Sequence, residues 1–265
     1  MPVEDIDILT VSGDSARWVS RAATKLVAAF ERWNGEGLTA GGRRCIDVGA
    51  STGGFTEVLL DRGAREVVAI DVGHGQLHPR VAADPRVREY SGTSIRGLSA
   101  ETVGGVADLV VTDLSFISLT LVAAELRGLL ESGADLVALI KPQFEVGRGR
   151  LGKNGVVTRP ADRARAITDV AAAFAAHGLR PRALDHSPII GSHGNAEYLL
   201  WAVAEPSVTV AGSSSAHRQP STAAHPSPDG VGESSTTVPS DTMGPTAIGE
   251  MARRLAETPS GGPVR

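Results

Sequence analysis

Charged side chains stand where four predicted strands end. Asp71, Asp113 and Lys141 follow the buried apolar runs VVAI, DLVVT and DLVALI, and Asp47 lies near the end of RCIDV. A single charged residue in such a place is often only a turn residue or a helix cap. Four in succession are better explained by a parallel sheet, whose strand carboxyl ends meet at one edge and line a ligand crevice. We therefore expect these groups, which can hold charge and move protons, to share one site.

A glycine-rich turn follows the first of these strands, in DVGASTGGFTEVLL. Gly49, Gly53 and Gly54 allow a tight turn and a close approach of the backbone to a ligand. A helix then opens at Phe55. Compared with the dinucleotide fingerprint GxGxxG, Ser51 replaces the second glycine, which makes the turn less suited to a pyrophosphate and weakens an assignment as an NAD-linked dehydrogenase.

A second acidic residue, Asp71, lies about twenty positions beyond the turn and can accept hydrogen bonds from ribose hydroxyls. Together with Asp47 it favours a nucleoside without phosphates, and S-adenosylmethionine is the candidate cofactor. Thr93 and Ser94 follow the third predicted strand, where an adenine base is usually bound. The residues predicted to bind the cofactor are Asp47, Gly49, Ser51, Gly53, Gly54, Phe55, Asp71, Val72, Thr93 and Asp113.

Apolar runs and helical segments alternate through the centre of the chain. Leu26, Phe30 and Trp33 follow helical spacing and predict a helix over 15–34. Strands are predicted at 44–48, 66–70, 87–90, 108–112, 136–140, 182–189 and 197–204, and further helices at 54–61, 119–130 and 159–177. This alternation implies an α/β, Rossmann-like fold with a mostly parallel seven-stranded sheet and helices on both faces.

Composition divides the 265 residues into three parts. Aromatic residues make up only 4% of the chain, and none follows position 205, where Gly, Pro, Ser and Thr predominate. Such a segment cannot bury enough apolar surface to offset the entropy of ordering it. We expect an N-terminal arm or linker remnant at 1–14, one globular domain at 15–205 and a disordered tail at 206–265. Helical spacing in AIGEMARRLAE predicts a short helix within that tail, which could dock on a partner but which we expect to be solvated.

Charge and composition disfavour several classes of protein. The formal net charge of −4 gives no sign of RNA binding. A single cysteine, Cys45, excludes an internal disulfide framework and fits a reducing cytoplasm. The histidines lack metal-ligand spacing, so no metal is predicted. No apolar run approaches the roughly 18 residues of a membrane span, and the acidic start MPVEDIDILT does not resemble a secretory leader.

Six sequence blocks occur in the order and spacing of a known family: VSRAATKL, DVGASTGGFTEVLLDRGA, DVGHGQL, DLSFISL, KPQFEVG and GNAEYLLW. The segment 13–204 resembles the TlyA (hemolysin A) family of FtsJ-like RNA 2′-O-methyltransferases. The resemblance implies a methyltransferase fold, S-adenosylmethionine at the glycine turn, and methyl transfer to a cytidine ribose of ribosomal RNA. It also implies a Lys-Asp-Lys-Glu tetrad, matched here by Lys25, Asp113, Lys141 and Glu197.

The resemblance makes chemical sense of these four residue types. A ribose 2′-hydroxyl is a poor nucleophile and must lose its proton as it attacks the methyl carbon. A lysine can take that proton when burial or a second cation favours its neutral form. We expect Lys141 to be this base, with Lys25 as the second cation that also helps to hold the target ribose. Asp113 and Glu197 are expected to orient the lysines and balance their charge.

The resemblance leaves the recognition of RNA open. Most relatives carry a basic RNA-binding domain ahead of this core, whereas this chain begins at a segment that resembles the linker. Phosphate contacts supply most nonspecific RNA affinity, so we expect weak binding to ribosomal RNA or ribosomal subunits through a modest basic rim, RGRLGK, or with a helper. The alternatives are a hemolysin-like protein, for which the sequence offers no strongly basic amphipathic helix, and a non-catalytic protein that binds RNA or cofactor.

Overall fold

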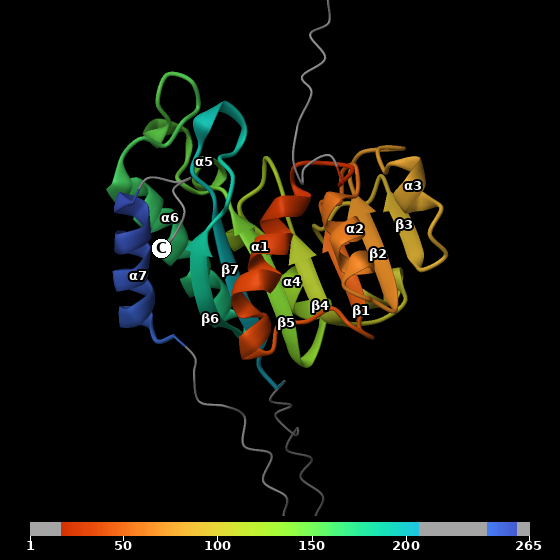
Figure 1. Ribbon diagram of the computed structural model, residues 1–265. Helices are drawn as coiled ribbons and strands as arrows, with labels where there is room; N and C mark the ends of the chain where they lie inside the picture. The colour runs from red at the N-terminus through yellow and green to blue at the C-terminus, as the bar shows by residue number, and fades with distance from the viewer. Residues whose placement is uncertain (1–16, 207–242, 259–265) are drawn as a thin grey trace, which may run out of the picture.

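A seven-stranded sheet with the order β3-β2-β1-β4-β5-β7-β6 forms the centre of the protein (Figure 1). The structure is a computed structural model and describes residues 17–206 and 243–258. The strands are β1 (Arg44–Val48), β2 (Glu66–Asp71), β3 (Val87–Ser91), β4 (Ala107–Thr112), β5 (Leu130–Ile140), β6 (Leu179–His186) and β7 (Tyr198–Ala204). β1 to β5 are parallel, and β7 is antiparallel to both of its neighbours. The predicted α/β, mostly parallel sheet is confirmed.

Helices cover both faces of this sheet. They are α1 (Ala23–Trp33), α2 (Gly54–Asp61), α3 (Pro79–Ala82), α4 (Ala123–Gly128), α5 (Pro142–Glu145), α6 (Pro160–Ala176) and α7 (Pro245–Glu257). Buried side chains of α1 and α2 pack in one cluster with the sheet, and those of α4, α6 and α7 pack in the other. The molecule therefore has three layers, with the strand carboxyl ends open to solvent between the two helical layers.

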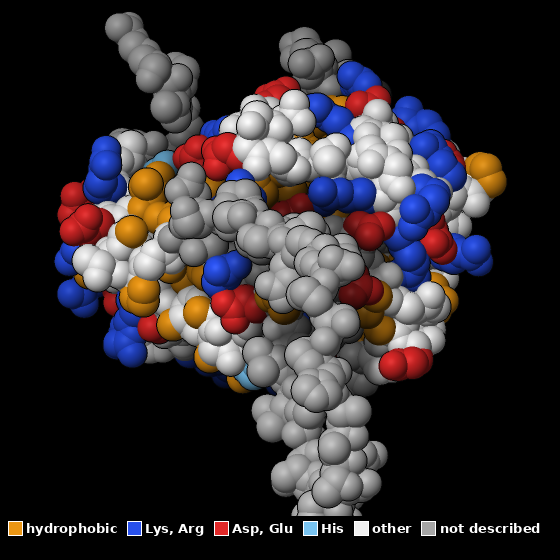
Figure 2. Space-filling view, turned by 90° about the horizontal axis from the view of Figure 1, so that it is seen from below, with side chains coloured by type: hydrophobic (Ala, Val, Ile, Leu, Met, Phe, Trp, Pro, Cys, Tyr) orange, Lys and Arg blue, Asp and Glu red, His pale blue; other side chains and the backbone are white. Residues whose placement is uncertain are grey.

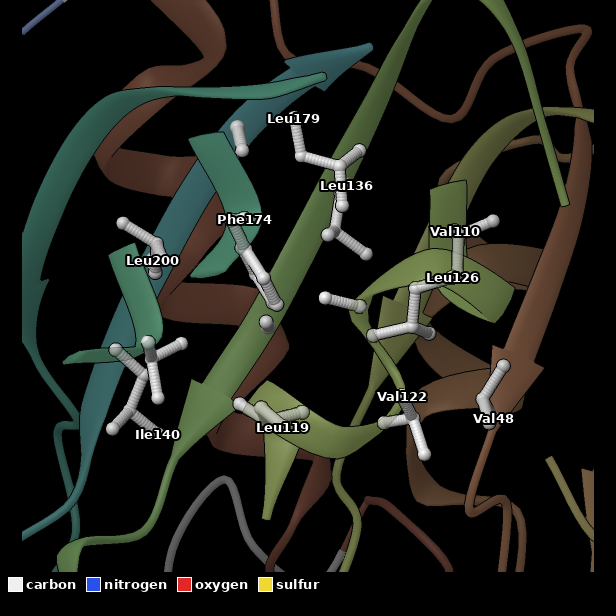
Figure 3. Packing of buried hydrophobic residues seen from close by; sticks show 14 of the residues in the cluster. Val48, Val110, Leu119, Val122, Leu126, Leu136, Ile140, Phe174, Leu179 and Leu200 are labelled. Carbon is white, nitrogen blue, oxygen red and sulfur yellow. The ribbon is translucent and has the colours of Figure 1, made fainter. Parts of the chain in front are cut away.

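The central strands β1, β2, β4 and β7 and the second half of β5 are buried along nearly their whole length because helices cover both faces of the sheet there, whereas β3 at the edge of the sheet is not. All five residues of β1 are buried, and Cys45 and Ile46 point into opposite clusters. Figure 3 shows the cluster on the α6 face, where Phe174 lies beside Leu136 and Leu200 of the sheet. On the other face the rings of Trp33 and Trp201 pack 5.9 Å apart.

Several element boundaries differ from those predicted. The first helix begins at Ala23, not at 15, because residues 17–22 form turns over α2. There the N–H of Val19 donates to Oε2 of Glu57 at 2.7 Å, and Ser20 packs directly on Gly54. The region predicted as a helix at 119–130 is a short 3-10 turn followed by α4. β5 begins earlier than predicted, and β6 is shifted toward the N-terminus.

The prediction of a solvated helix near the C-terminus is wrong. α7 packs against α6 and β6, and Ile248, Ala252 and Ala256 are at most 7% exposed. The spacing of these side chains was visible in the sequence, but the surface that they meet is created only when α6 and β6 come together. The other expected parts of the termini, the arm at 1–14 and most of the tail at 206–265, lie outside the described residues.

Charged side chains line the end of the sheet at which β1 to β5 begin. Figure 2 looks onto this end and shows Lys and Arg side chains gathered toward the β3 side. The ion pairs there are Arg65–Asp108, Arg86–Asp84 and Arg88–Glu66, at 3.7, 2.7 and 2.5 Å. Carboxylates thus neutralise much of this basic surface, and none of the predicted site residues lies there.

Candidate active site

The turn between β1 and α2 contains two positions that only glycine fits. Gly49 has φ +87°, and a Cβ atom there would lie 3.1 Å from the carbonyl oxygen of Asp113. Gly53 has φ +92°, and its Cβ would lie 2.7 Å from a leucine side chain. The N–H groups of Gly49 and Ala50 donate to the carbonyl of Ile70 at 2.8 and 3.0 Å. The turn is therefore fastened against the ends of its neighbouring strands.

Asp71 closes the other side of this turn. Its Oδ2 accepts a hydrogen bond from the N–H of Ser51 at 2.8 Å, and its Oδ1 accepts one from Gly73 at 2.7 Å. Ser51 has φ +49°, a left-handed conformation that residues other than glycine rarely adopt. Since the N–H of Ser51 already donates to the Asp71 carboxylate, the turn does not offer this donor to a phosphate. This agrees with the prediction that a turn with Ser51 in place of the second glycine is less suited to a pyrophosphate.

A cavity of about 480 Å³, here called the cofactor cavity, lies beside the turn. Asp71, Val72, Thr93 and Ser94 line it, as predicted for cofactor contacts, together with Gln76. Its apolar lining includes Phe116 and the aliphatic side chains of Val48, Ile70, Ile95, Leu114 and Ile117. An aliphatic slot with a carboxylate beside it suits an adenosine, whose base is flat and apolar on its faces and whose ribose offers two hydroxyl donors.

Four charged side chains meet in a second cavity of about 310 Å³, here called the tetrad cavity. Nζ of Lys141 lies 2.6 Å from Oδ1 of Asp113. Nζ of Lys25 lies 3.4 Å from Oδ2 of the same Asp113 carboxylate and 2.7 Å from Oε2 of Glu197. Their side chains are between 3% and 12% exposed, and their formal charges cancel. All four predicted tetrad residues are thus brought together.

Separate elements supply the four tetrad residues. Asp113 follows β4, Lys141 follows β5, and Glu197 precedes β7, so three adjacent strands deliver them to one edge of the sheet. Lys25 reaches the same place from the first turn of α1. The side chains lie up to 172 positions apart in the sequence (from Lys25 to Glu197) and are neighbours because the first turn of α1 reaches the cavity at these strand ends.

The two cavities share part of their lining, namely Gly49, Ser51, Asp113 and Ser115. A molecule in one cavity therefore meets a molecule in the other beside Asp113. Lys141 stands at this junction, where its Nζ also donates to Oγ of Ser115 at 2.9 Å and to the carbonyl of Asp113 at 3.5 Å. The arrangement can hold two reactants side by side with an amine between them.

The FtsJ-like methyltransferase family matches residues 18–204. The chain belongs to this family. It is accordingly an S-adenosylmethionine-dependent methyltransferase, and the lining of the cofactor cavity fits that cofactor.

Relatives of known name support the same assignment. The chain is 52% identical over 200 residues to the 16S/23S rRNA (cytidine-2′-O)-methyltransferase TlyA of Mycobacterium tuberculosis, covering 75% of this chain and 74% of the relative. It is 35% identical to the protein named Hemolysin A of Brachyspira hyodysenteriae, covering 74% and 81%. A solved structure from Streptococcus thermophilus, 39% identical, superimposes with a TM-score of 0.69 over 73% of this chain and 69% of that one.

In this FtsJ-like fold the predicted cofactor residues do not all line the cofactor cavity. Gly54 and Phe55 line the tetrad cavity instead, where Gly54 packs under Ser20. Gly53 lines neither cavity and serves the packing of the turn. Asp47 also lines neither cavity, so the prediction that it contacts the cofactor is corrected.

Asp47 is fully buried beneath the turn. Its Oδ2 accepts a hydrogen bond from Oγ1 of Thr56 at 2.7 Å, which ties β1 to α2. Burial raises the pKa of Asp47 to about 7, with the Thr56 hydrogen bond opposing this and the carboxylate of Asp113 adding to it. Asp47 therefore supports the turn from below, and its position two residues before Gly49 explains why it was mistaken for a contact.

Three neighbours of the tetrad were missed by the sequence analysis. Ser115 lies two positions after Asp113 and accepts from Lys141, a relation that the DLSF block could have suggested. Phe116 is 92% exposed with φ +64°, and its ring packs 5.2 Å from that of Phe144. A Cβ atom on Gly191 would lie 2.2 Å from Oε1 of Glu197, so this glycine leaves the space that the carboxylate occupies.

Other chemistry finds no support among the described residues. In residues 17–206 and 243–258 no group of three His, Cys, Asp or Glu side chains is placed to hold a metal ion. Cys45 is buried, and desolvation raises the pKa of its thiol to about 12, which makes it a poor nucleophile. Over the same residues, no helix has the length and apolar character that crossing a bilayer requires.

Proposed function

We propose that this methyltransferase acts on the ribose 2′-hydroxyl of a cytidine in ribosomal RNA, within ribosomal subunits of the cytoplasm. The observation that carries the proposal is the contact of one carboxylate, Asp113, with both Lys25 and Lys141 at the junction of two cavities. The name of the relative from M. tuberculosis supports the substrate, because that protein is a 16S/23S rRNA (cytidine-2′-O)-methyltransferase.

The residues of the tetrad cavity have distinct tasks in this proposal. When bound, S-adenosylmethionine supplies an electrophilic methyl group. Nζ of Lys141, once it has released a proton and is a neutral amine, accepts the proton of the ribose hydroxyl, since it lies at the junction of the two cavities. Asp113 holds the two lysines in place, and Glu197 fixes Lys25 through their 2.7 Å ion pair. Lys25 then holds the ribose and its phosphate beside Lys141.

Side chains around the cavities support a nucleic-acid substrate. Phe116 offers an exposed ring beside Asp113, and unstacked bases of single-stranded RNA stack on such aromatic side chains. Arg21 is exposed and lines the tetrad cavity. Arg148 and Lys153, from the predicted basic rim, are exposed beyond α5. These cations provide phosphate contacts close to the site.

The proposal is tested by incubating the purified chain with isolated small and large ribosomal subunits and methyl-labelled S-adenosylmethionine. We expect the label in 2′-O-methylcytidine after digestion of the RNA to nucleosides. Lys141→Ala should remove it, whereas Arg165→Ala should not, because Arg165 is an exposed residue of α6 whose side chain pairs with Asp169 at the surface. Label on a base, or cofactor binding with no labelled RNA in either subunit, would overturn the proposal and favour a non-catalytic binding protein.

A further inference from the structure

α7 lies beyond the segment that matches the family, which ends at residue 204. It runs beside α6 at the β6 edge of the sheet (Figure 1), and the N–H of Met243 just before it donates to the carbonyl of Pro181 in β6 at 3.1 Å. Leu255, near its C-terminus, packs beside the cluster of the α6 face. The helix thus ends near the N-terminus of α6, at the same end of the sheet as the tetrad.

Arg163 of α6 connects this helix end to the loop that precedes α6. Its Nη2 donates to the carbonyl of Ala256 at 2.5 Å. Its Nη1 donates to the carbonyls of Val157 and Thr158 at 3.1 and 2.9 Å. A guanidinium is suited to this task because its fork of fixed donors serves several carbonyls at once, and a cation is favoured at the C-terminus of a helix.

The loop that Arg163 holds is joined in turn to the loop that carries Glu197. The N–H of Val157 donates to Oδ1 of Asn195 at 3.0 Å, and Nδ2 of Asn195 donates to the carbonyl of Gly155 at 3.1 Å. Asn195 is 3% exposed and stands two positions before Glu197. A continuous series of hydrogen bonds therefore runs from α7 through Arg163 and Asn195 to the segment of the tetrad carboxylate.

We propose that Arg163 is a positioning residue through which the docking of α7 sets the place of Glu197 and of the loop at 152–158. When α7 is not docked, the guanidinium of Arg163 has no hydrogen bond to the carbonyl of Ala256. Arg163 is then held less firmly in the position from which it donates to the carbonyl of Val157. The Asn195 loop then loosens, and Glu197 holds Lys25 less well. The catalytic part of this inference rests on the proposed function, whereas its mechanical part does not.

Two pairs of matched variants test the inference in the full chain. Ala252→Glu places a charge on the buried face of α7, and Ala247→Glu places the same charge on an exposed position. Arg163→Lys keeps the positive charge but lacks the several fixed N–H donors of a guanidinium. Arg165→Lys makes the same change at an exposed site of α6. Hydrogen exchange is read for peptides that cover 152–158 and 189–197, together with kcat and the KM values for RNA and S-adenosylmethionine.

We expect Ala252→Glu and Arg163→Lys to speed exchange in both peptides and to lower kcat by about tenfold, with an unchanged KM for S-adenosylmethionine. The two control variants should match the original chain. Faster exchange of α7 in Ala252→Glu without any change at 152–158 and 189–197 would overturn the inference, because α7 would then only cover the core. Hydrogen exchange can be measured without catalysis. A chain that methylates no RNA would therefore contradict the proposed function, while the exchange data would still test the role of Arg163 and α7.

Discussion

Nζ of Lys141 lies 2.6 Å from Oδ1 of Asp113, while the other oxygen of the same carboxylate faces Lys25 at 3.4 Å. One aspartate therefore sets the positions of two lysines that would otherwise repel each other in a poorly solvated cavity. Because Asp113 also lines the cofactor cavity, the same carboxylate sets where the two reactants meet. The predictions below follow from this arrangement and from the turn beside it.

Lys141→Ala should abolish methyl transfer and leave S-adenosylmethionine affinity nearly unchanged. Removal of a general base costs about 10²- to 10⁴-fold in rate, and Lys141 lines the tetrad cavity but not the cofactor cavity. Initial rates with ribosomal subunits and calorimetric titration of the cofactor measure the two effects separately. A turnover equal to that of the unaltered chain would remove Lys141 from its role.

Lys25 and Glu197 should show strong coupling in a double-mutant cycle. Their side chains are 9% and 3% exposed, so Lys25→Met or Glu197→Gln alone leaves the partner poorly compensated, at a cost of about 3–5 kcal/mol in the free energy of unfolding. The double variant should lose less than the sum of the two. Urea unfolding of the four proteins measures this, and additive losses would show that the pair is not coupled.

Asp71→Ala should weaken S-adenosylmethionine binding by about tenfold or more, because a ribose loses its acceptor and the N–H groups of Ser51 and Gly73 lose theirs. Calorimetry measures the affinity. Asp61→Ala on α2 is the control, since its carboxylate pairs with Arg17 at the surface away from both cavities. Equal S-adenosylmethionine affinity in the two variants would show that Asp71 does not bind the ribose of the cofactor.

Asp47→Asn should change how stability depends on pH. The pKa of Asp47 is raised to about 7, so between pH 4 and pH 7 the folded chain holds a proton that the unfolded chain has released. The free energy of unfolding therefore falls as the pH rises through this window, and the cost of the buried charge is fully present above it. The variant lacks this contribution, whereas its amide oxygen can still accept from Thr56.

Chemical denaturation of both proteins at several pH values tests this. The difference in the free energy of unfolding should move in favour of Asp47→Asn by a few kcal/mol between pH 4 and pH 8. A difference that stays constant over this range would show that Asp47 is not the titrating group.

Much of the site was predictable because it depends on local rules. Strand ends can be located from apolar runs, and the carboxyl ends of parallel strands share an edge, and Asp71, Asp113 and Lys141 do lie together at that edge. Asp47 was misplaced by the same reasoning. A residue one position before the end of a strand points into the core or toward the edge according to the pleat and the packing of α2, which the pattern of apolar residues does not decide.

The sequence by itself determined the alternation of strands and helices and the glycine turn, and its resemblance to a known family indicated which four residues to propose as the tetrad. Tertiary structure alone decided that Lys25 of α1 pairs with Glu197, that Arg163 contacts the end of α7, and that α7 packs against the rest of the domain. The physical reason is that an apolar stripe on a helix records a tendency to be buried. The partner that buries it exists only once distant segments have formed a common surface.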